Sequence, residues 1–248
     1  MIRAWAMVLL VGLSVPSVDG QEAAPKKTLE ISQKNASLLQ RLGNYPDLET
    51  LAIHCLEHLR ALPDSIGKLA KLKALIIDNG NGCSMNPLLP ESIGNLHLLE
   101  KLVLYGAQDP QGAAGDRPVQ PKERHRFPSS MSELKNLRYL DLGRNDLDEI
   151  PAFVKDLPRL TELRFQWNPK LKTLPPFIAD LRELRTLSLD GNDLEDLPSF
   201  LNTLPKLTSI TLGNNCSITQ SAAKMNQLKK RFPRVKFDFT EEYDCPPQ

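Results

Sequence analysis

The sequence predicts an α/β solenoid built from repeats, and three observations point to this fold class. A Leu-Pro, Ile-Pro or Phe-Pro pair recurs six times in one register, and apolar residues follow each of these prolines at offsets of three, six and nine residues. Hydrophobic residues make up 41% of the chain but aromatic residues only 6%, so leucine has to carry the core. A register held through so many copies indicates stacked repeats, which offer an extended binding surface instead of a closed pocket. The prolines are Pro63, Pro90, Pro128, Pro151, Pro175 and Pro198.

The most regular copy runs from Leu137 to Pro151 and follows the pattern L-x-x-L-x-L-x-x-N-x-L-x-x-L-P, with isoleucine in its last apolar position. Side chains alternate across a strand, so the leucines of L-x-L face one side and predict a short strand. Proline ends this strand, and the spacing of three that follows suits a 3₁₀ turn. The asparagine falls where the chain turns inward, and its amide can satisfy buried backbone groups. Four copies carry it, at Asn145, Asn168, Asn192 and Asn215.

This pattern resembles the leucine-rich repeat family, in its class with repeats of about 23 residues and a Leu-Pro-x-x-Ile segment. The resemblance extends from about Leu48 to Phe239, which is nearly the whole chain after the first segment. It implies a horseshoe whose concave side is lined by short parallel strands. The convex side is then expected to consist of irregular or 3₁₀ turns.

Four segments are expected along the chain. Arg3 and the apolar run Ala4–Val15, which is 12 residues long and too short to span a bilayer, predict a secretory signal peptide removed near Gln21. The alternative is an uncleaved anchor. Removal leaves a mature chain without a membrane span, in a secreted, periplasmic or extracellular location. The segments are the signal peptide at 1–20, an N-terminal cap at 21–47, the repeats with a last capping strand at 48–239, and a C-terminal tail at 240–248.

The ends of the array and one insertion depart from the repeat pattern. Ser37–Leu42 favours a helix that covers the first repeat, and Ser221–Arg231 favours a helix at the other end. A last strand is expected at 232–237. Ala107–Arg126 is rich in Gly, Pro and Gln, which predicts a loop that leaves the end of a concave strand. Loops of this kind often carry function, so this loop competes with the concave face as the binding site.

Export makes the four cysteines candidates for disulfides. Cys216 and Cys245 belong to adjacent final units, and neighbouring strands lie about 4.8 Å apart, within the usual Cα range of a disulfide. Cys55 and Cys83 occupy loops of adjacent repeats and form the second predicted pair. Free thiols in a reducing compartment are the alternative.

Composition and motifs argue against several functional classes. A formal net charge of +1 does not indicate the strongly basic surface that nucleic-acid binding needs. His54 and His58 stand four residues apart, but this spacing presents two ligands on one face only in a helix, and the repeat places them at a strand end and in a loop. No metal site is therefore expected. The sequence contains no Ser-His-Asp arrangement and no Gly-rich phosphate loop, so neither catalysis nor a cofactor is expected.

The best functional signal lies at the strand positions between the core leucines, which face away from the core. In the middle of the array these positions hold tyrosine, tryptophan and arginine, the residues enriched at binding hot spots. We therefore expect non-covalent recognition of a protein or peptide on the concave face. The alternatives are recognition of a glycan or cell-envelope polymer, and a structural or assembly role. The predicted site comprises Lys101, Tyr105, Tyr139, Asp141, Arg144, Glu162, Arg164, Gln166 and Trp167.

Overall fold

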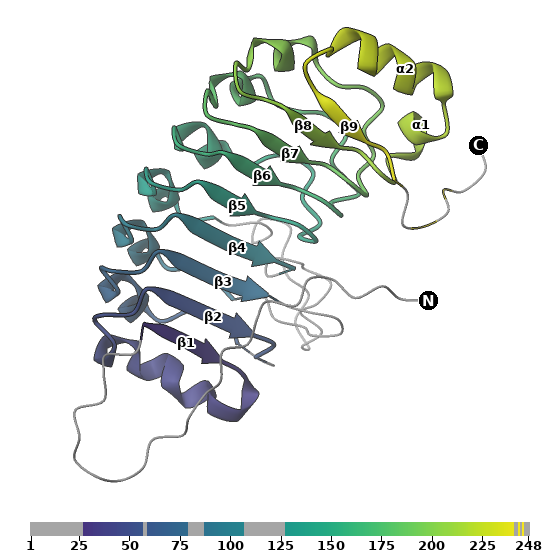
Figure 1. The fold of residues 1–248 in the computed structure, drawn as a ribbon. Helices are drawn as coiled ribbons and strands as arrows, with labels where there is room; N and C mark the ends of the chain where they lie inside the picture. The colour runs from purple at the N-terminus through teal and green to yellow at the C-terminus, as the bar shows by residue number, and fades with distance from the viewer. Residues whose placement is uncertain are drawn as a thin grey trace.

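A computed structural model describes residues 27–56, 59–78, 87–106 and 127–240, together with Tyr243 and Cys245. These residues form one parallel sheet whose nine strands follow one another in chain order (Figure 1). The result is a solenoid, as the sequence predicts. The strands are β1 (Thr28–Ile31), β2 (Thr50–His54), β3 (Ala74–Asp78), β4 (Lys101–Tyr105), β5 (Tyr139–Asp141), β6 (Glu162–Arg164), β7 (Thr186–Ser188), β8 (Ser209–Thr211) and β9 (Lys236–Asp238).

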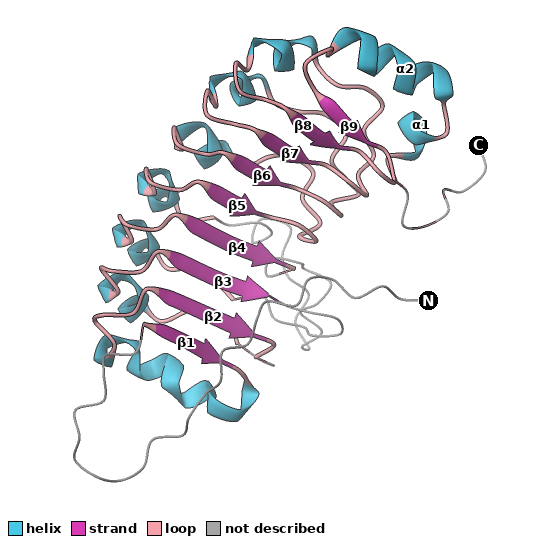
Figure 2. Cartoon of the chain, viewed as in Figure 1, coloured by secondary structure: helices cyan, strands magenta, loops and turns pink. Residues whose placement is uncertain are grey.

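Short 3₁₀ helices form a second row behind the sheet (Figure 2). From η2 to η8, each begins directly after a repeat proline, whose ring fixes φ and ends the extended path. The predicted 3₁₀ turns are therefore confirmed. The helices are η1 (Gln33–Asn44), η2 (Asp64–Lys68), η3 (Glu91–Asn95), η5 (Ser129–Glu133), η6 (Ala152–Asp156), η7 (Pro176–Asp180), η8 (Ser199–Thr203), α1 (Cys216–Thr219) and α2 (Ala222–Arg231).

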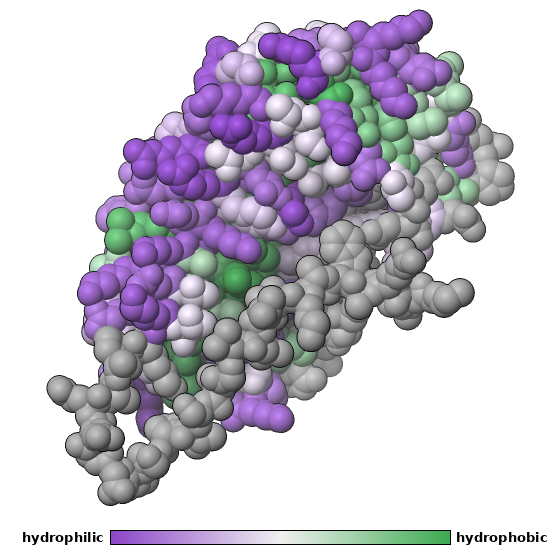
Figure 3. All heavy atoms as spheres, viewed as in Figure 1, coloured by the Kyte–Doolittle hydropathy of each residue, from purple (hydrophilic) through white to green (hydrophobic). Residues whose placement is uncertain are grey.

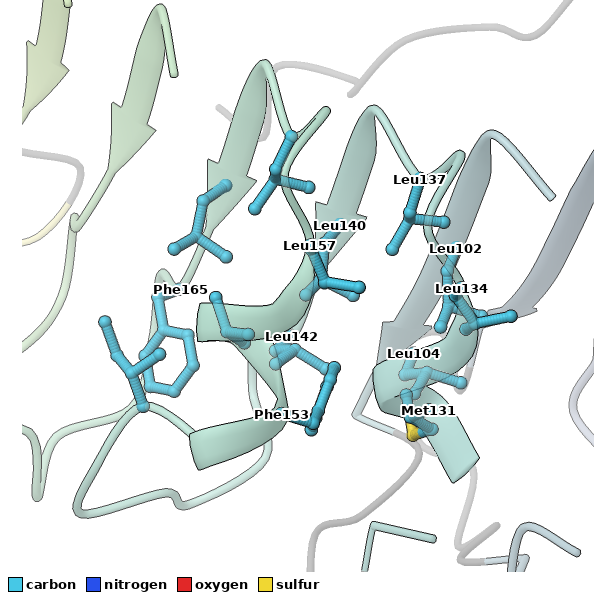
Figure 4. Close-up of a cluster of buried hydrophobic side chains, with 14 of the residues drawn as sticks. Leu102, Leu104, Met131, Leu134, Leu137, Leu140, Leu142, Phe153, Leu157 and Phe165 are labelled. Carbon is cyan, nitrogen blue, oxygen red and sulfur yellow. The ribbon is translucent and has the colours of Figure 1, made fainter. Parts of the chain in front are cut away.

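The core lies between the strands and the 3₁₀ helices and consists mainly of leucine. Figure 4 shows how Leu140 and Leu142 of one repeat point toward the same interior as Met131 and Leu134 of the helix before them. All four side chains are fully buried. Complete burial of such a side chain stabilises the fold by about 1.5–3 kcal/mol. Each repeat buries these side chains only against its neighbours, so the stability of one repeat depends on the repeats beside it.

A buried row of asparagines connects the turns that follow the strands. The Asn168 side chain accepts from the backbone N–H groups of Asn145 and Leu147, each at 3.0 Å. The backbone N–H of Asn168 in turn donates to Oδ1 of Asn192 at 3.0 Å. The predicted internal ladder is therefore present, and it fixes the turn that presents the residue before each asparagine.

The two ends of the array differ in part from the sequence-based expectation. A strand at 28–31 was not predicted, although Leu29 and Ile31 alternate with exposed residues as a strand requires. The helix expected at 37–42 lies inside the longer η1. At the other end α2 agrees with the prediction, but the last strand begins at Lys236, because Phe232 ends α2 and is buried beneath it. The short α1 was not predicted.

Several expectations fall outside the described residues. They concern the signal peptide at 1–20, His58, Cys83 and the loop at 107–126. Within the described part of the chain, no helix has both the length and the hydropathy needed to cross a membrane.

Candidate binding face

Parallel pairing in register arranges the solvent-facing strand residues in rows that cross the strands. Lys101, Tyr139 and Glu162 occupy one row, on β4, β5 and β6. Val103, Asp141 and Arg164 occupy the next row. The structure therefore brings the central members of the predicted site onto adjacent strands. Figure 3 shows a largely polar face, with apolar atoms exposed over β3 and β4, where Ile76 and Val103 are half-buried.

Tyr139 stands at the centre of this face between two cations. The ammonium of Lys101 lies 4.8 Å from the centroid of its ring, and the guanidinium carbon of Arg164 lies 5.3 Å from it. Nε of Arg164 also donates to Glu162 at 2.6 Å. Burial and the nearby charge of Asp141 raise the pKa of Tyr139 to about 12, so its hydroxyl stays protonated at physiological pH. These contacts hold the ring and the guanidinium in place.

Asp141 lies beneath the face and not on it. Its side chain is only 5% exposed, and Oδ1 accepts from the backbone N–H of Gly143 at 2.9 Å. Burial raises the pKa of this carboxyl, while the Gly143 amide, Arg164 and Gln166 oppose that shift. Asp141 is therefore less accessible to solvent than Tyr139 and Arg164, which are half-buried.

Two aromatic rings of the predicted site rest on glycines of the following repeat. A Cβ atom added to Gly143 would lie 2.9 Å from the Tyr105 ring, and one added to Gly191 would lie 2.2 Å from Cε3 of Trp167. Only glycine leaves room for the rings at these distances. Trp167 also meets Tyr243 edge-on, with ring centroids 5.3 Å apart. The tryptophan ring is thus half-buried, whereas its strand position alone predicts an exposed side chain.

The residue before each ladder asparagine adopts a left-handed backbone conformation. The φ angle is +58° at Trp167 and +55° at Arg144, compared with +67° for glycine at position 191. A bulky residue in this conformation carries about 1–3 kcal/mol of strain and persists only where its surroundings enforce it. The sequence contains a signal for this conformation, because Gly106, Gly191 and Asn214 stand at the same place in their repeats. Such strain in a bulky residue points toward function.

The residue immediately before each strand was missed as a functional position. Backbone N–H groups of these residues bond in succession across the array, for example Thr161 to Arg138 and Arg185 to Thr161, each at 2.8 Å. Arg138 and Arg185 therefore lie along one edge of the face, two strands apart, and both side chains are exposed. Arg138 and Arg185 directly follow the first leucine of their repeats, Leu137 and Leu184, and this recurrent position was the signal that could have identified them.

Disulfides tie the ends of loops near this face. Cys216 and Cys245 are bonded, with Cα atoms 5.5 Å apart, as the sequence predicts. Cys55 is also disulfide-bonded, and its predicted partner Cys83 lies outside the described residues. His54 is exposed at the end of β2. Among the described residues, no three His, Cys, Asp or Glu side chains are grouped so as to hold a metal ion.

Parts of this chain are similar to a known family and to known proteins. The family model for the leucine-rich repeat matches residues 136–157. The disease resistance protein RPS4B of Arabidopsis thaliana is 29% identical over 119 residues, which represent 46% of this chain and 10% of that protein. A solved leucine-rich repeat protein of Leptospira interrogans is 24% identical with a TM-score of 0.46, covering 81% of this chain and 57% of that chain. The repeat register and the asparagine ladder follow the leucine-rich repeat pattern, and the family model matches that pattern at residues 136–157.

Proposed function

We propose that this protein is an exported recognition module that binds a protein or peptide through the centre of its concave face. Leucine-rich repeat proteins generally mediate binding between proteins. The observation that carries the proposal is the arrangement around Tyr139, whose ring is held between Lys101 and Arg164.

The energetics of interfaces favour such an arrangement. Tyrosine, tryptophan and arginine dominate binding hot spots because they offer large contact areas together with hydrogen bonds. Binding also costs about 0.5–1.5 kcal/mol for each flexible side chain that becomes ordered. Arg164 is already held by contacts with Glu162 and Tyr139. The ring of Trp167 is held by its close packing on Gly191. Binding a ligand at this face therefore costs little side-chain conformational entropy.

Export forms part of the proposal and has its own support. The sequence at 1–20 has the character of a secretory signal, and the Cys216–Cys245 disulfide suits an oxidising compartment. Protein isolated from the native host should then begin near Gln21. Mass spectrometry that finds Met1 on a soluble cytosolic product would contradict export.

Partner capture tests the binding face directly. The exported protein is used as bait in extracts of its host, beside the variants Tyr139→Ala, Arg164→Ala and Trp167→Ala. If these residues are anchors, each truncation should weaken binding by about 2 kcal/mol, or roughly thirtyfold. Lys155→Ala is the matched control, because Lys155 is exposed on η6 at the convex side.

The result that contradicts the proposal is specific. A partner retained by all three concave variants but lost when residues 107–126 are deleted would place the binding site on that loop. Denaturant midpoints measured for each variant separate loss of binding from loss of folding.

A further inference from the structure

Charged side chains alternate along the edge of the face where the strands begin. Lys27, Glu49 and Lys73 are consecutive members of this edge, and their backbones are joined by hydrogen bonds of 2.8 Å. Glu49 forms ion pairs with both lysines, at 2.9 Å to Lys27 and 2.8 Å to Lys73. These contacts with Lys73 and Lys27 lower the pKa of Glu49 to about 2. In the first part of the array, the edge charges are thus neutralised within the protein.

The alternation fails in the second part of the array because threonine takes the acidic positions. Arg138 is followed along the edge by Thr161, then Arg185, then Thr208. The threonine hydroxyls donate back to the Arg138 and Arg185 carbonyls, at 2.9 and 3.3 Å. Among the described residues, no carboxylate lies within ion-pair distance of either arginine side chain.

The acids near this edge are shared with other cations. Glu183 pairs with Lys206 at 2.7 Å, and the charges of Lys206, Arg185 and Arg138 together lower the pKa of its carboxyl. Glu162 pairs with Arg164 at 2.6 Å. Glu100 is the exposed member of this edge between Lys73 and Arg138, joined to each by a backbone hydrogen bond of 2.8 Å, and it remains as one opposing carboxylate. Lys101 has no ion pair among the described residues and lies against the Tyr139 ring. We name Arg138 and Arg185 the cationic edge, and Lys101 lies in the next row of the face.

We infer that the cationic edge binds an acidic segment of the partner with the pattern Asp/Glu-x-x-Asp/Glu in an extended, polyproline-II conformation. Arg138 and Arg185 are two strands apart, which is about 10 Å at the usual strand spacing. In polyproline II, residues three apart point the same way and lie about 9 Å apart. Each arginine fork can then meet one carboxylate in bidentate geometry. Tyr139 beside them supplies an aromatic surface of the kind that polyproline-II segments contact.

This inference rests on the proposed function, and it deepens that proposal by naming the ligand class. A phage-displayed library of random dodecapeptides serves as the probe and is selected on the exported protein. Enriched peptides are synthesised, and their Kd values are measured for the wild type and for Arg138→Glu/Arg185→Glu. The matched control is Lys155→Glu/Lys230→Glu, which changes net charge equally at two exposed convex or terminal-helix positions. Tyr139→Ala reports on the face itself.

The expected result is enrichment of paired acids three residues apart. Reversal of the two arginines should raise Kd about tenfold or more, the control should change it little, and added salt should weaken binding. Moving the acids next to each other in the peptide should also weaken binding.

Other outcomes separate the two ideas. Peptides that bind through Tyr139 but are not acidic, or that ignore the arginine reversal, overturn the inference and leave the proposed function standing. Peptides that bind Tyr139→Ala as well as they bind the wild type overturn the proposed concave site. A selection that enriches nothing overturns both.

Discussion

Replacing Asn192 by leucine tests whether the asparagine ladder holds the turns together. Leucine keeps the approximate size of the side chain but removes its hydrogen bonds. Asn192 makes three such bonds, accepting from Asn168 N–H at 3.0 Å and donating to the carbonyls of Phe165 and Leu189 at 3.1 and 2.7 Å. All of these groups are buried, so water cannot replace the lost partner without opening the turn.

The size of the loss follows from which groups retain another partner. The Phe165 carbonyl still accepts from Asn168 at 3.0 Å, and the Leu189 carbonyl still accepts from Asn215 at 2.8 Å. Each of these carbonyls therefore loses one bond of about 0.5–1.5 kcal/mol, whereas the Asn168 N–H loses its acceptor at a cost of about 1–3 kcal/mol. The sum predicts that Asn192→Leu lowers the free energy of unfolding by about 2–6 kcal/mol.

A second ladder variant should lose more stability. Asn168→Leu takes the acceptor from two backbone N–H groups, those of Asn145 and Leu147, so it should cost more than Asn192→Leu. Asn202→Leu is the control, because Asn202 is exposed and donates only to the Arg231 carbonyl at 3.0 Å. Urea titrations followed by circular dichroism give the three midpoints. Equal losses at Asn192 and Asn202 would refute the register and with it the placement of the whole face.

Three further predictions use the same titrations. Gly94→Ala should cost about 1–3 kcal/mol, because its Cβ would lie 2.6 Å from the backbone oxygen of Ser130, whereas Gly43→Ala, whose nearest neighbour would be 4.0 Å away, should not. Trp167→Gly should change stability by less than about 1 kcal/mol, since relief of left-handed strain offsets the lost ring contacts, yet it should abolish concave binding. Burial raises the pKa of Asp141, so its native state binds the proton more tightly than its unfolded state and loses stability as pH rises. Asp141→Asn should therefore raise the midpoint at neutral pH, an advantage that disappears by about pH 4.

The repeat register could be predicted from the sequence because it depends on local rules. Alternation along a strand fixes the inward direction of Leu140 and Leu142, and a proline fixes the start of each 3₁₀ helix. The ladder was predictable for the same reason, since a buried turn needs an amide such as that of Asn168. These features repeat, so each copy reinforces the interpretation of the next.

The parts of the site that escaped prediction depend on contacts between repeats. The buried state of Asp141 and the cations on either side of Tyr139 appear only when adjacent strands are placed in register. The contact between Trp167 and Tyr243 depends on how the last segment folds back, which a disulfide between distant cysteines decides. Local pattern alone determines none of these three arrangements.

The ladder also explains how a strained tryptophan can persist at the edge of the face. The backbone N–H of Trp167 donates to the Asp190 carbonyl at 2.7 Å, and the next residue, Asn168, is anchored on both sides by side-chain bonds. A left-handed conformation at Trp167 is therefore enforced from both directions, at a cost that the buried ladder offsets. Two other repeats meet the same constraint with Gly106 and Gly191, which carry no such strain. The array thus has an unstrained solution available at this position, and the use of tryptophan there agrees with the proposed role of its ring in recognition.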